Sequence, residues 1–172
     1  GTSWHAGLVA EYMFEEYARL PVEVEYASEF RYRKPVIKEK DLVIAISQSG
    51  ETADTLSAIE MAKEMGATIF GICNVAGSSI PRTTHAGVFT HAGPEIGVAS
   101  TKAFTSQLDV LYMMALRMGY RRGHIPESEY HKLLNELSLL PQKIQETIEA
   151  TDEKIQEIAR RYVNSPNFLY LG

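Results

Sequence analysis

The apolar run Leu42-Val-Ile-Ala-Ile46, followed directly by the polar run Ser47-Gln-Ser-Gly-Glu-Thr52, decides the fold class of this chain. A continuous apolar run is typical of a strand that is buried on both faces of a parallel sheet. Residues 52–65 then show helical spacing and end at Gly66, a residue type that commonly follows a helix. Strand, polar loop and helix in this order predict a parallel α/β unit.

The same alternation of strands and helices continues on both sides of this stretch. Strands separated by helices pair in parallel, with helices on both faces of the sheet. We therefore expect an α/β fold, a three-layer αβα sandwich around a mostly parallel sheet. The further strands are expected at 22–26 (where Val alternates with Glu, as at a sheet edge), 67–73 and 87–90, and the further helices at 4–20, 27–33 and 101–118.

The last part of the chain has a different composition. Residues 126–163 are rich in Glu, Lys, Leu and Ile, which predicts two or three helices with breaks near Pro141 and Thr151. The expected organisation is an α/β domain over 1–125, a helical connector over 126–166 and the start of another strand over 167–172. A weaker alternative makes the helices of 126–163 mainly an interaction surface.

Composition excludes several classes of protein. The chain has 172 residues, 45% of them hydrophobic, and a net charge of −5, which is globular and not the basic character of a nucleic-acid binder. No apolar run approaches the length of a membrane span. One cysteine, Cys73, excludes an internal disulfide, and the five histidines show no metal-binding spacing, so we expect no metal, no cofactor and a cytoplasmic setting. The residue types at both ends suggest a piece of a longer protein.

The loop Ser47–Thr52 is the strongest candidate site. In an open parallel sheet, ligands bind beyond the carboxyl ends of the strands. Ser47, Gln48, Ser49 and Thr52 bring hydroxyl and amide groups around Gly50, next to a helix N-terminus with free N–H groups. This combination predicts a phosphate site that needs no metal and no basic side chain. The simpler alternative is that Ser49 and Thr52 only cap the helix.

Two further polar loops open helices, Gly1-Thr2-Ser3 and the segment 95–101. In the second of these, capping of the long helix by Ser100 or Thr101 is as good an explanation as binding. Lys102 is close enough in sequence to reach an anion, although a lone lysine in a first turn is more often solvated. Glu95 is a candidate general base, but the sequence offers no partner and favours a structural role.

These loops occur in an order that closely resembles the isomerising glutamine–fructose-6-phosphate aminotransferase family. The resemblance covers the whole chain, and its motifs at 47–55 and 95–105 are near diagnostic. It implies the first sugar isomerase (SIS) domain of that family and the helices leading to a second one. The motifs that carry it are Gly1-Thr2-Ser3, ASEFRYR at 27–33, SQSGETADT at 47–55, CNV at 73–75, GSS at 77–79 and EIGVASTKAFT at 95–105.

The resemblance implies a ligand and its contacts. Members of the family make glucosamine-6-phosphate from fructose-6-phosphate and glutamine-derived ammonia, so these sugar phosphates are the expected partners, in a homodimer formed through the isomerase portion. No catalytic residue carries over, because the family's acid–base and Schiff-base groups belong to its second SIS domain. The alternative is a stand-alone SIS module that senses a sugar phosphate. Ser3, Ser47, Gln48, Ser49 and Thr52 match phosphate-binding positions, and Thr2, Val98 and Ser100 match positions that touch the sugar.

The family also has a strand that ends just before the position of Gly1. The terminal residues Phe168-Leu-Tyr-Leu-Gly172 have the composition of a strand, and in the family they would begin the second SIS domain. If the protein begins at Gly1, we therefore expect residues 168–172 to take the place of the first strand beside 42–46, from the same chain or from a swapped copy.

Overall fold

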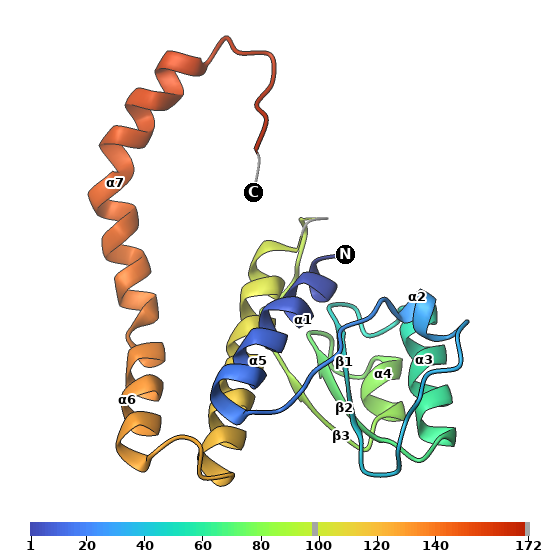
Figure 1. Cartoon of the computed structure of the whole chain (residues 1–172). Helices are drawn as coiled ribbons and strands as arrows, with labels where there is room; N and C mark the ends of the chain where they lie inside the picture. Colours follow the sequence, from blue (N-terminus) through green and yellow to red (C-terminus); the bar gives the residue numbers. More distant parts are fainter. Residues whose placement is uncertain (98–99, 171–172) are drawn as a thin grey trace. The chain divides into compact units, whose positions relative to one another are not determined.

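The computed structural model describes residues 1–97 and 100–170 (Figure 1). The chain divides into two compact units, Gly1–Tyr130 and His131–Gly172. Among the described residues, none of the helices is both long enough and apolar enough to cross a membrane. The elements are α1 (Thr2–Met13), η1 (Phe14–Ala18, a π-helical turn), α2 (Ala27–Phe30), β1 (Leu42–Ser47), α3 (Ala53–Glu64), β2 (Thr68–Cys73), α4 (Ser79–Thr83), β3 (Ala86–Phe89), α5 (Thr101–Arg121), α6 (Glu127–Ser138) and α7 (Leu140–Tyr162).

The expected parallel sheet is present in the first unit. Its strands lie in the order β1-β2-β3, and both pairs are parallel. The register pairs Leu42 with Thr68 and Ser47 with Cys73, and Cys73 in turn pairs with Phe89. All three strands therefore end at the same edge of the sheet, and the loops that follow them start there.

Helices cover both faces of this sheet, which confirms the α/β sandwich (Figure 1). Successive side chains of a strand point to opposite faces. In β2, Ile72 packs into a core cluster that includes residues of α1 and α5, whereas Ile69 packs with Ile59 of α3 and Ile80 of α4. These isoleucines are at most 1% exposed, so each face of the sheet has its own apolar core.

Close backbone contact joins α5 to η1. A Cβ atom added at Gly119 would lie 2.2 Å from the carbonyl oxygen of Tyr17 and 2.7 Å from Cδ1 of Ile125. The helix expected over 4–20 ends in the π-helical turn of η1, and Arg19 follows it in the left-handed conformation with φ of 51°. Only a glycine at position 119 lets the backbones of α5 and η1 approach this closely.

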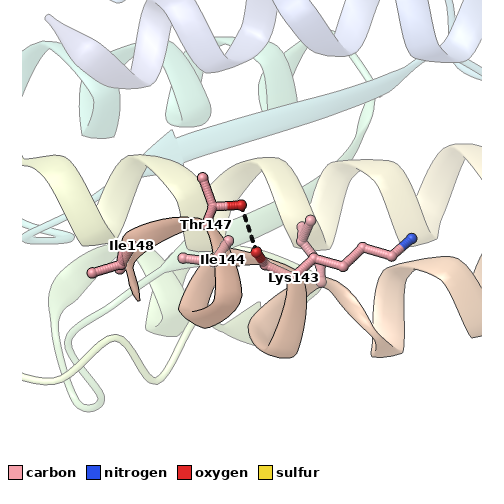
Figure 2. A pocket seen from close by; sticks show the side chains of 5 residues that line it. Lys143, Ile144, Thr147 and Ile148 are labelled. Atoms are coloured by element: carbon pink, nitrogen blue, oxygen red, sulfur yellow. Dashed lines mark hydrogen bonds between the residues drawn. The ribbon is translucent and has the colours of Figure 1, made fainter. Parts of the chain in front are cut away.

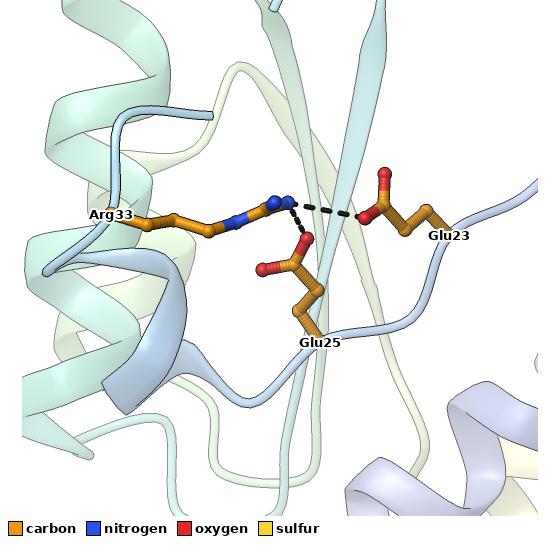
Figure 3. A network of polar contacts seen from close by, with 3 residues as sticks. All are labelled: Glu23, Glu25 and Arg33. Carbon is orange, nitrogen blue, oxygen red and sulfur yellow. Dashed lines mark hydrogen bonds and ion pairs between the residues drawn. The ribbon is translucent and has the colours of Figure 1, made fainter. Parts of the chain in front are cut away.

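The prediction of an edge strand at 22–26 was wrong. The structure has no strand there, because the side chains that alternate in the sequence make tertiary contacts instead of lining a sheet. Arg33 pairs with Glu23, at 3.2 Å between Nη2 and Oε1, and also with Glu25 (Figure 3). Tyr26 stacks on Trp4 of α1, with the ring centroids 4.4 Å apart. The segment is thus a strap of irregular backbone.

The second unit is helical, as expected, with one difference. A break falls at Leu139, and Pro141 lies in the first turn of α7, where a proline costs no hydrogen bond. The second break, expected near Thr151, is absent because α7 is continuous from Leu140 to Tyr162. The Thr151 hydroxyl donates to the carbonyl oxygen of Thr147 at 2.7 Å, so its polar group is satisfied inside the helix.

An exposed apolar stripe runs along α7. Figure 2 shows its first turns, where Lys143, Ile144, Thr147 and Ile148 line a shallow groove.

Residues 167–170 are described and form no strand; Phe168, Leu169 and Tyr170 are 58%, 82% and 89% exposed. The strand expected at 168–172 is therefore not formed over 168–170, and residues 171–172 lie outside the described part of the chain.

Replacing Gly119 with alanine tests the contact between α5 and η1. We expect Gly119→Ala to destabilise the chain by about 3 kcal/mol, because a backbone oxygen cannot move away from the new methyl group as a side chain can. Urea unfolding measures the change. The exposed Arg121→Ala, two residues further along the same helix, is the control and should unfold within about 0.5 kcal/mol of the parent chain. Equal stability of the two variants would contradict the close contact.

Candidate functional site

The loop after β1 is folded around the Ser47 hydroxyl. Ser47 is only 4% exposed, and its Oγ accepts a hydrogen bond from the Gly50 amide at 3.0 Å. The same Oγ lies 3.5 Å from Oγ1 of Thr52. A serine at the end of a buried strand therefore holds the turn and faces a second hydroxyl at the start of α3.

Gly50 makes this turn possible. Its φ of +70° lies in the left-handed region, and a Cβ atom there would come within 2.0 Å of Oγ of Ser78. Ser78 is 4% exposed, and its hydroxyl donates to the carbonyl oxygen of Val75 at 2.8 Å, so it has little freedom to move. The carbonyl oxygen of Gly50 accepts from the Ile80 amide at 3.0 Å. The first loop is thus fixed against the loop that follows β2.

The N-terminus of α3 has no side-chain cap from its own N-cap residue. Thr52 occupies the N-cap position, yet its side chain makes no capping hydrogen bond. Oγ of Ser49 instead accepts from the Glu51 amide at 3.2 Å, within the loop. The alternative in which Ser49 and Thr52 serve to cap this helix is therefore wrong. The first amides of α3, and the positive end of its dipole, remain available to an anion.

The one acidic side chain in the first turn of α3 is neutralised. Asp54 accepts a hydrogen bond from Nη1 of Arg31 at 2.7 Å, and this bond raises the pKa of Arg31 above its ordinary value. Arg31 follows α2 directly and belongs to the motif ASEFRYR at 27–33, whose first four residues form α2. The pairing reduces the repulsion that Asp54 would exert on an anion at this helix end.

Asn74 connects the loops of all three strands. Its amide donates to the carbonyl oxygen of Gln48 at 3.2 Å, and its Nδ2 donates to that of Gly93 at 2.7 Å. Its Oδ1 accepts from Oγ1 of Thr90 and from the amide of Ala92, at 3.0 and 2.9 Å. Sequence reasoning assigned Asn74 no role, although an asparagine directly after a buried strand is a signal for one.

Glu51 adds a further link between these loops. Its Oε1 accepts a hydrogen bond from the Ser79 amide at 2.8 Å. Hydrogen bonds from Ser79 lower the pKa of the Glu51 carboxyl below its ordinary value. Glu51 is therefore ionised at neutral pH and holds the start of α4 against the first loop.

Glu95, in the third loop, caps the N-terminus of α5. Its Oε2 accepts from the Ala103 amide in the first turn of α5 at 3.0 Å, and its Oε1 accepts from the Gly97 amide at 3.3 Å. The structural role favoured for Glu95 is confirmed. Ser100 sits at the N-cap with φ of 58° and makes no side-chain capping bond, so the structure does not support the alternative in which Ser100 caps this helix. Lys102 is exposed. Val98 lies outside the described residues.

Ser3, in the first turn of α1, contacts α5. Thr2 begins α1, and Oγ of Ser3 accepts a hydrogen bond from Nε2 of Gln107 at 3.1 Å. Gln107 is 2% exposed and lies on α5, 104 positions away in sequence. The structure therefore joins Ser47 to Thr52, and Ser3 to a residue that sequence reasoning missed. Within the described residues, no group of three or more His, Cys, Asp or Glu side chains is placed to hold a metal ion.

Residues 1–117 match the family model of the SIS domain. This chain belongs to the SIS domain family. The matched region contains all three polar loops and the sheet that positions them. The family assignment and the geometry of the site thus concern the same part of the molecule.

Curated relatives match this SIS chain over its whole length. It is 58% identical over 172 residues to the glutamine–fructose-6-phosphate aminotransferase (isomerizing) of Bacteroides thetaiotaomicron and 57% identical to that of Chlorobaculum tepidum. It spans 28% of the length of each. The solved C-terminal domain of glucosamine-fructose-6-phosphate aminotransferase from Francisella tularensis superposes with a TM-score of 0.86 at 39% identity, over 95% of this chain and 46% of that one. The resemblance read from the motifs is confirmed.

Alanine at Gly50 tests the turn of the first loop. We expect Gly50→Ala to destabilise the chain by about 3 kcal/mol, because a positive φ and a clash with a buried hydroxyl act together. Gly77 is the matched control, since it has φ of +81° but open space around its Cβ position. Gly77→Ala should cost only about 1 kcal/mol. If thermal melts show equal losses for both variants, Ser78 does not restrict this turn.

The Cys73 thiol provides a pH test of the core below the site. Cys73 is 1% exposed, and burial raises the pKa of its thiol to about 11. An unfolded chain releases this proton near pH 8.5. The contribution of the thiol to the free energy of unfolding is therefore fully present at neutral pH and is lost as the pH rises from about 8.5 to 11. Urea unfolding at pH 7, 9 and 10.5 measures this loss. The Cys73→Ala variant should lack the part of the loss that comes from the thiol, and identical pH dependence in both chains would refute the expectation.

Proposed function

We propose that this chain is the sugar-phosphate-binding half of the isomerase portion of a glutamine–fructose-6-phosphate aminotransferase. The relatives that support this proposal carry that name along the full length of the chain. The observation that carries it is the free N-terminus of α3, bordered by the hydroxyl groups of Ser47, Ser49 and Thr52. The ligand class is fructose-6-phosphate or glucosamine-6-phosphate.

The proposed binding mode uses neutral donors. A phosphate monoester carries about −1.5 to −2 charges at pH 7. The first amides of α3 supply N–H donors and the positive end of the dipole, and the hydroxyls supply O–H donors, so the anion needs no lysine. In this proposal Ser3, Ser47, Gln48, Ser49 and Thr52 hold the phosphate. Thr2, Val98 and Ser100 contact the sugar.

The chemistry of the full aminotransferase is assigned to segments outside this chain. The chain spans 28% of the length of the relatives it matches, and the family resemblance implies that the acid–base and Schiff-base groups belong to a second SIS domain. We propose that the isolated chain binds but does not convert fructose-6-phosphate. Formation of glucosamine-6-phosphate or glucose-6-phosphate at a rate proportional to purified chain would contradict this part of the proposal.

The proposal extends to assembly and location. In the full protein we assign the SIS portion to a homodimer that works in the cytoplasm. The presence of one cysteine, which is free and buried, agrees with a reducing compartment. Gel filtration of the chain over a concentration range tests the dimer, because a single copy has a mass of 19.2 kDa.

The Ser49 hydroxyl gives a direct test of phosphate binding. We expect Ser49→Ala to weaken binding of fructose-6-phosphate by about 1.5–3 kcal/mol, the usual value of a hydrogen bond to a charged group. Its thermal stability should stay nearly unchanged, because Ser49 is not a helix cap. Titration calorimetry measures the affinity, and Ser57→Ala, inside α3 and outside the loop, is the control that should bind like the parent chain.

Two ligand comparisons decide whether the phosphate is the recognised group. Fructose-6-phosphate should bind more tightly than free fructose, because the proposed donors face the phosphate. Inorganic phosphate should compete for the site. Equal affinity for fructose and for its phosphate ester would refute the proposed function, and so would a Ser49→Ala variant that loses stability but keeps its affinity.

A further inference from the structure

A buried amide side chain stands behind one of the proposed phosphate ligands. Gln107 of α5 is 2% exposed, and its Nε2 donates a hydrogen bond to Oγ of Ser3 at 3.1 Å. A hydroxyl group has one proton to donate and two lone pairs. Since the lone pair that faces Gln107 accepts a hydrogen bond, the Ser3 proton must point in another direction.

The Ser3 hydroxyl differs in its hydrogen bonding from hydroxyl groups further inside the helices. Serine and threonine hydroxyls inside a helix usually donate to the carbonyl oxygen four residues earlier. In this chain Thr83, Ser106 and Thr147 each do so, at 2.9, 2.9 and 2.7 Å. For Ser3, by contrast, the hydrogen bond within the described part of the chain is the one that its Oγ accepts from Gln107, so its proton is not committed to a helical carbonyl group there.

The contact is poorly arranged for stability. Within the described residues, Oε1 of Gln107 is buried without a hydrogen-bond partner. Nε1 of Trp4, next to Ser3 in α1, is also buried without one, so these two atoms do not satisfy each other. An unsatisfied buried acceptor destabilises a fold, and an apolar side chain of similar shape is commonly neutral or better. Packing alone therefore does not account for a glutamine at this position.

We propose that Gln107 is a positioning residue for anion binding: by donating to Oγ of Ser3, it directs the Ser3 proton toward the phosphate. This inference rests on the proposed function, because Ser3 matters for binding only if a sugar phosphate occupies the site. Gln107 itself does not touch the ligand. Its loss lets the Ser3 hydroxyl rotate and accept from other donors, which lowers affinity without removing a ligand contact.

The test is a double-mutant cycle with fructose-6-phosphate as the probe. The variants are Gln107→Met, which keeps length and removes the amide, Ser3→Ala, and the two combined. Gln107→Met should weaken binding about three- to tenfold in the parent chain. In the Ser3→Ala background it should change the affinity less than about twofold, since no hydroxyl remains to be directed. Its melting temperature should equal or exceed that of the parent, whereas a merely structural glutamine would lower it.

The outcomes separate the two proposals. Coupled losses of affinity with unchanged or raised melting temperature support the positioning role. Parent-like affinity of Gln107→Met, or equal losses in both Ser3 backgrounds, would overturn it while leaving phosphate binding intact. A parent chain that does not bind fructose-6-phosphate at all would overturn the proposed function first and this role with it. Ser106→Ala, the neighbouring residue on α5, serves as the control and should bind like the parent chain.

Discussion

The parallel pairing of β1 with β2 is the constraint on which the rest of the first unit depends. Its register places Ser47 opposite Cys73, so that both strands end together and their loops begin at one edge. This alignment brings donors and acceptors of the two loops within hydrogen-bonding distance. One example is the bond from the Asn74 amide to the Gln48 carbonyl oxygen at 3.2 Å. A shift of register by one residue would turn every side chain of the strand toward the opposite face of the sheet and so into the wrong core.

The two helices that start at this edge differ in what satisfies their first amides. In α5 the carboxylate of Glu95 accepts from the Ala103 amide, so a fixed negative charge occupies the helix end. In α3 the Thr52 side chain makes no cap, and Arg31 neutralises the nearby Asp54. An anion is therefore favoured at α3 and opposed at α5. The same type of feature, a polar loop before a helix, thus serves folding in one place and, in our proposal, binding in the other.

Much of the fold could be predicted from residue patterns, and the failures have physical causes. Strands 42–46 and 67–73 are buried on both faces, and their continuous apolar runs identify them without tertiary information. The segment 22–26 has the alternation of an edge strand, but its glutamates bind Arg33 and its backbone has no neighbouring strand to pair with. The helix break expected near Thr151 is absent, and the Thr151 hydroxyl bonds within α7.

The sequence by itself determined the α/β class, the loop Ser47–Thr52 as the candidate site and, through its motifs, the family. These features are local, since each depends on residues that are close together in the chain. Only the tertiary structure decided that Glu95 caps α5, that the Thr52 side chain leaves α3 uncapped, and that Gln107 reaches Ser3. The last contact spans 104 positions. No periodicity or spacing encodes such a pair, because the partners meet only when α1 and α5 pack on the same face of the sheet.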